Sequence, residues 1–337
     1  MTEIQYTKRL LNFLPILGML CLLMVFSMGC NSSSSGGGQG GSSNTNDSVE
    51  VKETATVGSI RIGVDETLRP IGRQMVNAFM NLHAEAKITI DYQPENILFQ
   101  RLLEDSVRLI LAGRDLTEGE RYRIKQEQII AKTTQLGTDA MVVVMHPDNP
   151  YDSLSREQLQ GLLNGTLKTW DQLDSAQSGE IVLVFDDANT GTLRLLTELI
   201  LPVGDTIQGK AYAAKGHEDL VEYVGSNPQA LGFIGASWIT DQDQPQVREF
   251  REKVKWARLE APDTSDVAGQ YVRPFQAEIT LKRYPLCRPF YAHSREHFSG
   301  LGTGFVVFAA GEQGQRIVLK SGLNPQFPPP RYLIFEE

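Results

Sequence analysis

The sequence has few cysteines, and its one long apolar run is confined to its beginning. Cysteine occurs three times in 337 residues, at Cys21, Cys30 and Cys287. If Cys21 leaves with an export signal and Cys30 is modified, Cys287 has no partner and no internal disulfide can form. Because the rest of the chain contains no second run of bilayer-spanning length, we expect a folded body stabilised by its own hydrophobic core.

Sequence signatures of common enzyme classes are also missing. There is no Walker motif, nucleophile elbow or zinc signature, and His293 and His297 lack the metalloprotease pattern between them. We expect no metal and no other cofactor. The formal net charge is -9, which disfavours nucleic acid as a partner. These absences favour a binding protein over an enzyme.

The first 30 residues are typical of a bacterial lipoprotein signal. Lys8 and Arg9 precede an apolar run over residues 10–26, and Gly29 stands directly before Cys30. A basic start, a short apolar stretch and a small residue before the cleavage point mark an exported precursor. We therefore predict that residues 1–29 are removed and that Cys30 carries the lipid, of which palmitate is one component.

The alternative is an uncleaved transmembrane helix. A span needs about 20 apolar residues, and Asn12, Pro15 and Gly18 interrupt this run. Residues 30–56 are rich in Ser and Gly and predict a flexible tether. We expect a monomer held by its lipid on the outer, periplasmic side of a bacterial membrane.

Strand-like and helix-like segments alternate through the remainder of the chain. Apolar residues at helical spacing follow Pro70, and Ser155 with Gln158 forms a capping box that opens another helix. Such alternation predicts an α/β fold with largely parallel sheets. The expected strands are residues 60–64, 88–92, 107–112, 141–145, 181–185, 231–234 and 270–281.

In open α/β sheets, ligands bind beyond the carboxyl ends of strands. This rule selects three polar loops of the sequence as candidates. They are Asp65-Glu66-Thr67, then Asp105-Ser106 with Arg114 at the other end of the same strand, and Asn189-Thr190-Gly191-Thr192.

The third loop has the composition of an anion site. Small hydroxyl residues around Gly191 at a helix start present N–H and O–H donors and the positive end of the helix dipole to one point. Ordinary capping by Asn189 or Thr190 explains the same residues equally well. The loop alone does not decide between the two.

Arg114 and three carboxylates are further candidates. A guanidinium at Arg114 could bind an oxyanion through two N–H groups, or it could pair with Asp115 or Glu118 on the surface. Carboxylates are compatible with a protonated oxyanion, because they accept its proton and repel fully ionised sulfate. Asp65, Glu66 and Asp105 could serve in this way or could cap helices.

Several segments resemble the phosphate-type substrate-binding proteins of ABC transporters, within the two-lobed periplasmic binding protein class (type II). The resemblance follows the chain in order from residue 60 to 325. The matching segments are residues 154–159, 163–170 with its Gly165 and Trp170, 227–235, 284–315 and 322–325.

The resemblance implies two α/β lobes, formed by residues 57–139 plus 237–337 and by residues 140–236. It implies that an oxyanion binds between them and is delivered to the permease of an ABC transporter. A phosphatase-like enzyme and a degenerate sensor or scaffold are the alternatives. The residues expected around the ligand are Thr67, Ser106, Arg114, Thr190, Gly191 and Thr192.

One departure from the family pattern concerns charge. The family carries an Arg shortly before a Ser-Gly-Thr loop, whereas residues 186–189 here are Asp-Asp-Ala-Asn. Arg114 and Arg194 are the candidates to replace that Arg.

Overall fold

The computed structural model describes residues 53–173, 178–186, 191–241 and 243–329. The described residues belong to one compact unit, Glu50–Glu337. The predicted signal and Cys30 lie outside the described residues, as do most of the tether, Asn189 and Thr190. Within the described part, no helix has both the length and the apolar character needed to cross a membrane.

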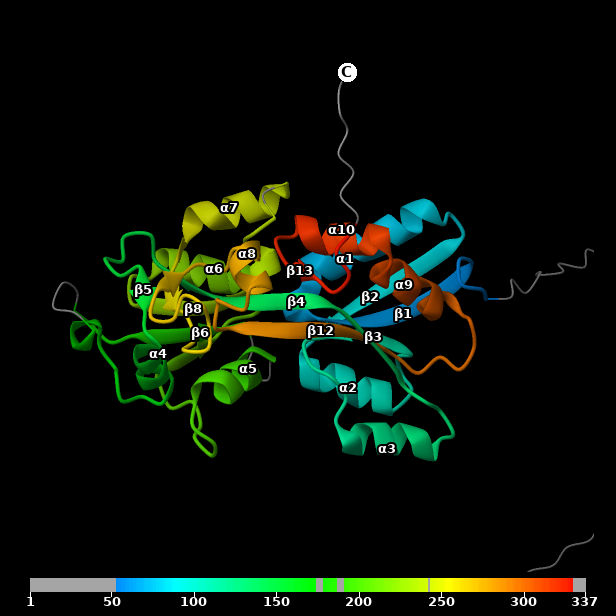
Figure 1. Cartoon of the computed structure of the whole chain (residues 1–337), viewed down its shortest axis with the longest axis horizontal. Helices are drawn as coiled ribbons and strands as arrows, with labels where there is room; N and C mark the ends of the chain where they lie inside the picture. Colours follow the sequence, from blue (N-terminus) through cyan, green and yellow to red (C-terminus); the bar gives the residue numbers. More distant parts are fainter. Residues whose placement is uncertain (1–52, 174–177, 187–190, 242, 330–337) are drawn as a thin grey trace, which may run out of the picture. The chain divides into compact units, whose positions relative to one another are not determined.

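One large mixed sheet organises the described residues (Figure 1). Three parallel strands at each end flank two central strands that run antiparallel to their neighbours. The order across the sheet is β2 (Ala86–Gln93), β1 (Gly58–Asp65), β3 (Leu109–Ala112), β12 (Cys287–Ser294), β4 (Lys132–Met145), β8 (Ala230–Gly235), β6 (Val182–Phe185) and β7 (Ala211–Ala213).

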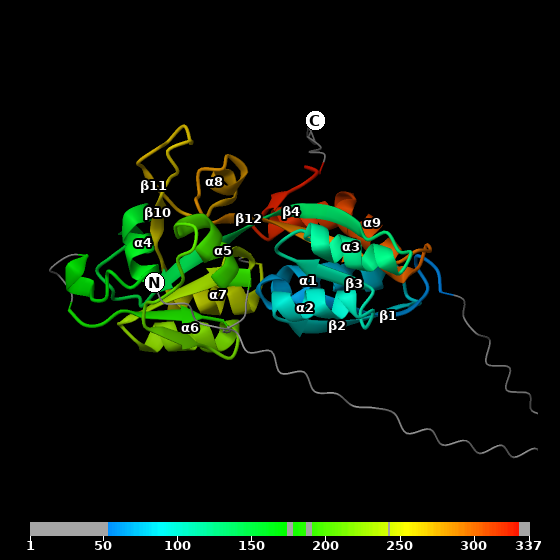
Figure 2. The same cartoon turned by 90° about the horizontal axis from the view of Figure 1, so that it is seen from below.

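The central strand β4 joins the two parallel halves of this sheet. Its residues 132–140 pair with β12, whereas residues 141–145 pair with β8. β4 and β12 run side by side in both views (Figure 2). One continuous strand therefore passes from one set of parallel strands to the other.

Short strands extend this framework. β9 (Lys255–Trp256) and β13 (Asn324–Pro325) each pair with β4, at Val144–Met145 and at Gly137–Thr138 respectively. A separate three-stranded sheet consists of β5 (Ser153–Leu154), β10 (Arg258–Glu260) and β11 (Tyr271–Val272).

Helices cover both faces of the sheet. Around β1 to β3, α1, α9 and α10 lie on one face and α2 and α3 on the other (Figure 1). The helices are η1 (Glu66–Leu68), α1 (Arg69–Leu82), α2 (Glu95–Leu103), α3 (Glu118–Gln126), α4 (Arg156–Leu163), η2 (Trp170–Gln172), α5 (Gly191–Ile200), α6 (His217–Ser226), η3 (Ala236–Trp238), α7 (Pro245–Lys253), α8 (Gln276–Thr280), α9 (Leu301–Ala310) and α10 (Glu312–Lys320).

Most of the predicted strands and helices are confirmed. β3, β6 and β8 are buried at every position, as expected for parallel strands covered on both faces. The capping box at the start of α4 is present, with Gln158 N donating to Ser155 Oγ at 3.1 Å and Ser155 N donating to Gln158 Oε1 at 2.9 Å. The predicted α/β fold with largely parallel strands is thus observed.

The strand predicted over residues 270–281 is wrong. Only Tyr271 and Val272 pair as a strand, and residues 276–280 form α8. Pro274 lacks the N–H that a sheet ladder needs. Phe275 and Leu281 are 52% and 54% exposed, so the alternating apolar residues do not form one buried face.

Candidate functional site

The carboxyl ends of β1 and β3 and the start of α5 meet at one buried guanidinium, that of Arg288. A Cβ atom added at Gly113, which follows β3, would lie 2.8 Å from Arg288 Nη1, and one added at Gly191, the first residue of α5, would lie 3.3 Å from it. β1 and β3 are parallel, so their carboxyl ends share one edge of the sheet. The rule that ligands bind beyond these ends therefore leads to a real cluster of polar groups.

Arg288 is the only fully buried cation of this cluster, since its side chain is 1% exposed. It is the direct cross-strand partner of Asp139 in β4, and its Nε and Nη2 lie 3.3 and 3.1 Å from Asp139 Oδ2. Nη2 also donates to the hydroxyl of Thr67. Nη1 has no hydrogen-bond partner among the described residues. The two available donor positions on Nη1 thus lie next to the backbone of Gly113 and Gly191.

Asp65 ends β1 and holds Thr67 in place. Its Oδ1 accepts hydrogen bonds from Thr67 N at 2.9 Å and from Thr67 Oγ1 at 2.8 Å, which caps η1. Burial raises the pKa of Asp65 to about 6, against the lowering effect of Arg288, and the negative charge of Glu95 adds to the rise. This carboxyl therefore changes its charge near neutral pH.

Burial also raises the pKa of Asp139, even though Arg288 and two backbone N–H groups favour its ionised form. For Arg288, burial alone would lower the pKa, but the attraction of Asp139, Asp65 and Glu95 outweighs it and raises the pKa. The cluster consequently keeps one permanent positive charge among several carboxyl groups.

Two of the predicted cations lie at the edge of the cluster and bind Glu95 in α2. Arg194 Nε is 2.8 Å and Arg114 Nε 3.5 Å from Glu95 Oε1. Arg114 also makes two hydrogen bonds of 2.8 Å to Glu120 and stacks on the ring of Phe99. The surface carboxylate that pairs with Arg114 is thus that of Glu120, not that of Asp115 or Glu118. Both guanidinium groups, of Arg114 and of Arg194, are already paired with carboxylates.

The structure brings some predicted site residues together and separates others. Thr67, Asp65 and Gly191 contact or adjoin Arg288, and Thr192 is buried with its Oγ1 4.0 Å from Met141 Sδ. Glu66 turns to Arg69, with their nearest atoms 2.7 Å apart.

Asp105 and Ser106 lie at the opposite end of β3 from this cluster. Both are exposed and precede the amino end of the strand. Asp105 pairs with Arg295 at 3.0 Å, and Ser106 Oγ donates to Arg101 O at 3.2 Å. They belong to the surface around α2 rather than to the group around Arg288.

The sequence did not point to Arg288, Asp139 or Glu95. The sequence did indicate that some cation must come from elsewhere in the chain, because the Arg that the family carries before residues 190–192 is missing here. Residues 287–294 mix Cys, Arg, Pro and His with apolar residues, a pattern that does not predict a buried strand.

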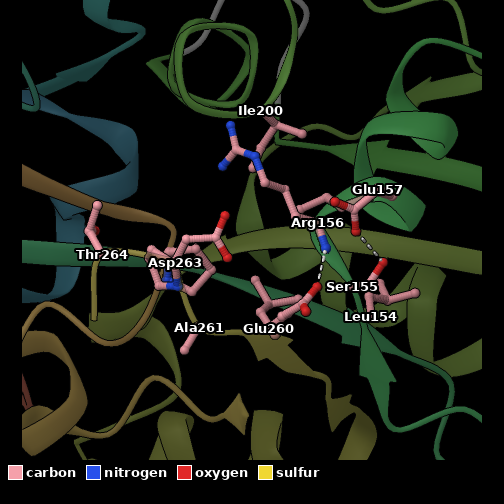
Figure 3. A pocket seen from close by; sticks show the side chains of 13 residues that line it. Leu154, Ser155, Arg156, Glu157, Ile200, Glu260, Ala261, Asp263 and Thr264 are labelled. Atoms are coloured by element: carbon pink, nitrogen blue, oxygen red, sulfur yellow. Dashed lines mark hydrogen bonds between the residues drawn. The ribbon is translucent and has the colours of Figure 1, made fainter. Parts of the chain in front are cut away.

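An open cavity elsewhere in the described structure is lined by more acidic than basic groups. It has a volume of about 250 Å³ and lies where α4 meets the segment after β10. Figure 3 shows Arg156 in it, with its backbone N donating to Glu260 Oε2 at 3.1 Å, and Glu157 and Asp263 nearby. Arg156 Nη2 donates to Leu199 O at 2.7 Å. This cavity contains none of the predicted site residues and is a poor anion site.

Comparisons with known proteins identify the family of the chain. A family model described as a PBP superfamily domain matches residues 50–313. A phosphate-binding protein PstS from Staphylococcus saprophyticus is 23% identical over 253 residues, which cover 74% of each chain.

Solved structures give the same result. A putative phosphate ABC transporter substrate-binding protein from Clostridium perfringens, with bound phosphate, aligns with a TM-score of 0.66 and 21% identity over 80% of this chain and 99% of that chain. An ABC-type phosphate transport receptor from Vibrio cholerae aligns with a TM-score of 0.58 and 19% identity, covering 80% of this chain and 100% of its own. The fold class and the resemblance expected from the sequence are confirmed: the chain belongs to the PBP superfamily.

Proposed function

We propose that this protein binds phosphate, or a related small oxyanion, and delivers it to the permease of an ABC transporter without making or breaking a bond. The observation that carries the proposal is Arg288 Nη1, a buried donor with no partner among the described residues, placed beside Gly191 at the start of α5. An unmade hydrogen bond on a buried group costs about 1–3 kcal/mol or more. An oxyanion between Arg288 and the first N–H groups of α5 would remove that cost.

Arg288 takes the role of the Arg that the family carries before its Ser-Gly-Thr loop. The guanidinium comes from β12 instead of from the residues before α5, yet Gly191 and Gly113 leave room for it close to the start of α5. Arg194 and Arg114 support the site indirectly, because they hold Glu95 beside Gly191.

Among the three carboxylates proposed as proton acceptors, Asp65 fits the role best. It is fully buried and linked through Thr67 to Arg288, whereas Glu66 and Asp105 are engaged elsewhere. An ionised Asp65 accepts a hydrogen bond from a protonated phosphate oxygen and repels sulfate, which has no O–H group to donate. The proposed ligand is therefore an oxyanion that carries at least one proton.

Isothermal calorimetry of the purified protein at pH 7.5 tests this function. We expect phosphate to bind and sulfate to compete weakly. Gly191→Ala should weaken phosphate binding by at least about tenfold, because the new methyl group would lie 2.9 Å from Glu95 Oε2 and would fill the space beside Arg288. Gly119→Ala in α3 is the control, since an added Cβ there meets nothing within 4 Å. No heat from any oxyanion with the unmutated protein would refute the proposal.

We also propose that the ligand is enclosed by two lobes that close about β4. The pairing of β4 supports a boundary between Ala140 and Met141, close to the predicted one at residue 139. Pairing of β9 with β4 and of β10 with β5 favours adding residues 245–260 to the lobe of residues 140–236. Closure would then bring Arg194 of α5 to Glu95 of α2.

The location follows from the sequence and from the relatives' transport role. We propose an extracytoplasmic monomer anchored to a bacterial membrane through a lipid on Cys30. Mass spectrometry of the protein isolated from membranes should find a mature chain that begins at an acylated Cys30. A Cys30→Ser protein should then be released from the membrane. An unmodified Cys30 in the isolated protein would rule out the anchor and leave the binding proposal intact.

A further inference from the structure

His217 lies at the edge of the same site, although nothing in the sequence singled it out. It is the first residue of α6 and is 0% exposed. Gly216 before it has φ of 110° and donates its N–H to Asp186 O at 3.0 Å. This bond ties the start of α6 to the carboxyl end of β6, the edge at which ligands bind in such sheets.

A chain of contacts connects His217 to Arg288. The imidazole stacks on Trp238, with ring centroids 4.5 Å apart and an interplanar angle of 7°. The indole N–H of Trp238 donates to Thr67 O at 3.2 Å, and the hydroxyl of Thr67 accepts a hydrogen bond from Arg288. Trp238 thereby fixes the plane of the imidazole beside the residues of the anion site.

The imidazole is neutral at physiological pH. Burial, and to a smaller extent the positive charges of Arg288 and Arg69, lower the pKa of His217 to about 3. The nearest carboxylate is that of Asp186, whose Oδ2 is 3.9 Å from His217 Nδ1, beyond hydrogen-bond distance. A neutral imidazole carries one N–H donor and one acceptor nitrogen.

Neither ring nitrogen of His217 has a hydrogen-bond partner among the described residues. The other fully buried histidine, His293, shows the usual arrangement for a core imidazole. Its Nδ1 is 3.1 Å from Thr133 Oγ1, and its Nε2 is 2.9 Å from Arg114 O. Because buried polar groups are almost always paired, the nitrogens of His217, which have no hydrogen-bond partner within the described part of the chain, are available to a bound ligand.

We propose that His217 is a ligand-binding residue, whose N–H donates a hydrogen bond to one oxygen of the bound oxyanion. This inference rests on the oxyanion-binding function proposed above. A neutral donor adds a hydrogen bond without a second buried positive charge. His217 then binds an oxygen that carries no proton, while Asp65 accepts the proton of another oxygen.

Three variants and one spectroscopic measurement test the assignment. His217→Phe keeps the ring that stacks on Trp238 but removes both nitrogens, and His217→Gln keeps an N–H donor of similar reach. His83→Phe is the matched control, since His83 also packs on an aromatic ring, 4.6 Å from Phe79. Phosphate binding is measured by calorimetry on the whole protein, together with thermal unfolding without ligand.

We expect His217→Phe to weaken phosphate binding by about 10- to 100-fold, as for a hydrogen bond to a charged group. Its unfolding temperature should be unchanged or higher, because an unpaired polar group is removed. His217→Gln should bind within about fivefold of the unmutated protein, and His83→Phe should bind normally.

Nitrogen-15 NMR of the imidazole in the unmutated protein needs no substitution, so the test does not depend on how the variants fold. Phosphate should shift one ring nitrogen signal of His217 and protect its proton from exchange. If the unmutated protein binds phosphate but these signals do not move, or if His217→Phe binds equally well, the role of His217 is refuted and the proposed function stands. If the unmutated protein binds no oxyanion, both are refuted.

Discussion

Replacing Arg288 by Met should abolish measurable phosphate binding and destabilise the protein. The substitution removes the only fully buried cation next to Gly191 and leaves Asp139 without its partner across the strands. Loss of one member of a buried charged pair costs about 3–5 kcal/mol of stability. Loss of the charged donor to the oxyanion should separately lower the affinity at least about 100-fold. The free energy of unfolding should fall by about 3 kcal/mol, and less at low pH, where Asp65 and Asp139 are protonated. Calorimetry and urea unfolding measure the two effects.

Arg295→Met provides a matched control. Arg295 directly follows β12, and its side chain is also 1% exposed. It pairs with Glu127 and Asp105, away from the candidate site. We expect a similar loss of stability with normal phosphate binding. Equal losses of binding in both variants would mean that Arg288 acts through stability alone, contrary to its assignment as a ligand-binding residue.

Asp65 should contribute a loss of stability to the ligand-free protein as the pH rises from about 4 to about 6, whereas the lowered pKa of His217 contributes in the opposite direction. The pKa of Asp65 is about 6 in the folded protein and has an ordinary value of 3.8. Between these values the folded state keeps a proton that the unfolded state has released, so rising pH favours unfolding. For this one group the difference amounts to about 3 kcal/mol. Asp139 contributes with the same sign, because its pKa is also raised.

Urea unfolding at a series of pH values, with and without Asp65→Asn, measures this contribution. The amide cannot ionise but can still accept the hydrogen bond from Thr67 N, so the variant should lose the Asp65 contribution, and its stability should rise more with pH than that of the unmutated protein. Asp148→Asn should leave the profile unchanged, because the Asp148 side chain is 92% exposed. If the unmutated protein and Asp65→Asn show the same pH dependence between pH 4 and pH 6, the raised pKa of Asp65 is contradicted.

The sequence was sufficient to predict those strands and helices that short stretches of the chain specify by themselves. Continuous apolar runs predicted β6 and β8, and the capping box predicted the start of α4. The carboxyl-end rule selected Thr67 and Gly191, which the structure brings to Arg288. It failed for Asp105 and Ser106, because they precede β3 and so lie at the other edge of the sheet.

Arg288 could not be predicted, because its environment is built from distant parts of the chain. In β12, Arg288 stands in the same alternating row as Phe290, where a buried apolar residue would be expected. It is tolerated there because Asp139, 149 positions away, lies directly opposite in β4, and Thr67, 221 positions away, accepts its hydrogen bond. The residues next to Arg288 in the sequence give no indication of partners so far away along the chain.

The sequence by itself determined the α/β class and the family resemblance, and it offered the loop before α5 as a candidate anion site. These properties depend on apolar periodicity, strand ends and helix starts, which are local along the chain. Only the tertiary structure decided which cation faces that loop, which carboxyl group accompanies it, and that His217 joins them. Burial and long-range pairing determine the charge of these side chains and which of their donors remain without a partner. Burial and pairing arise only when β1, β4, β12 and α6 come together.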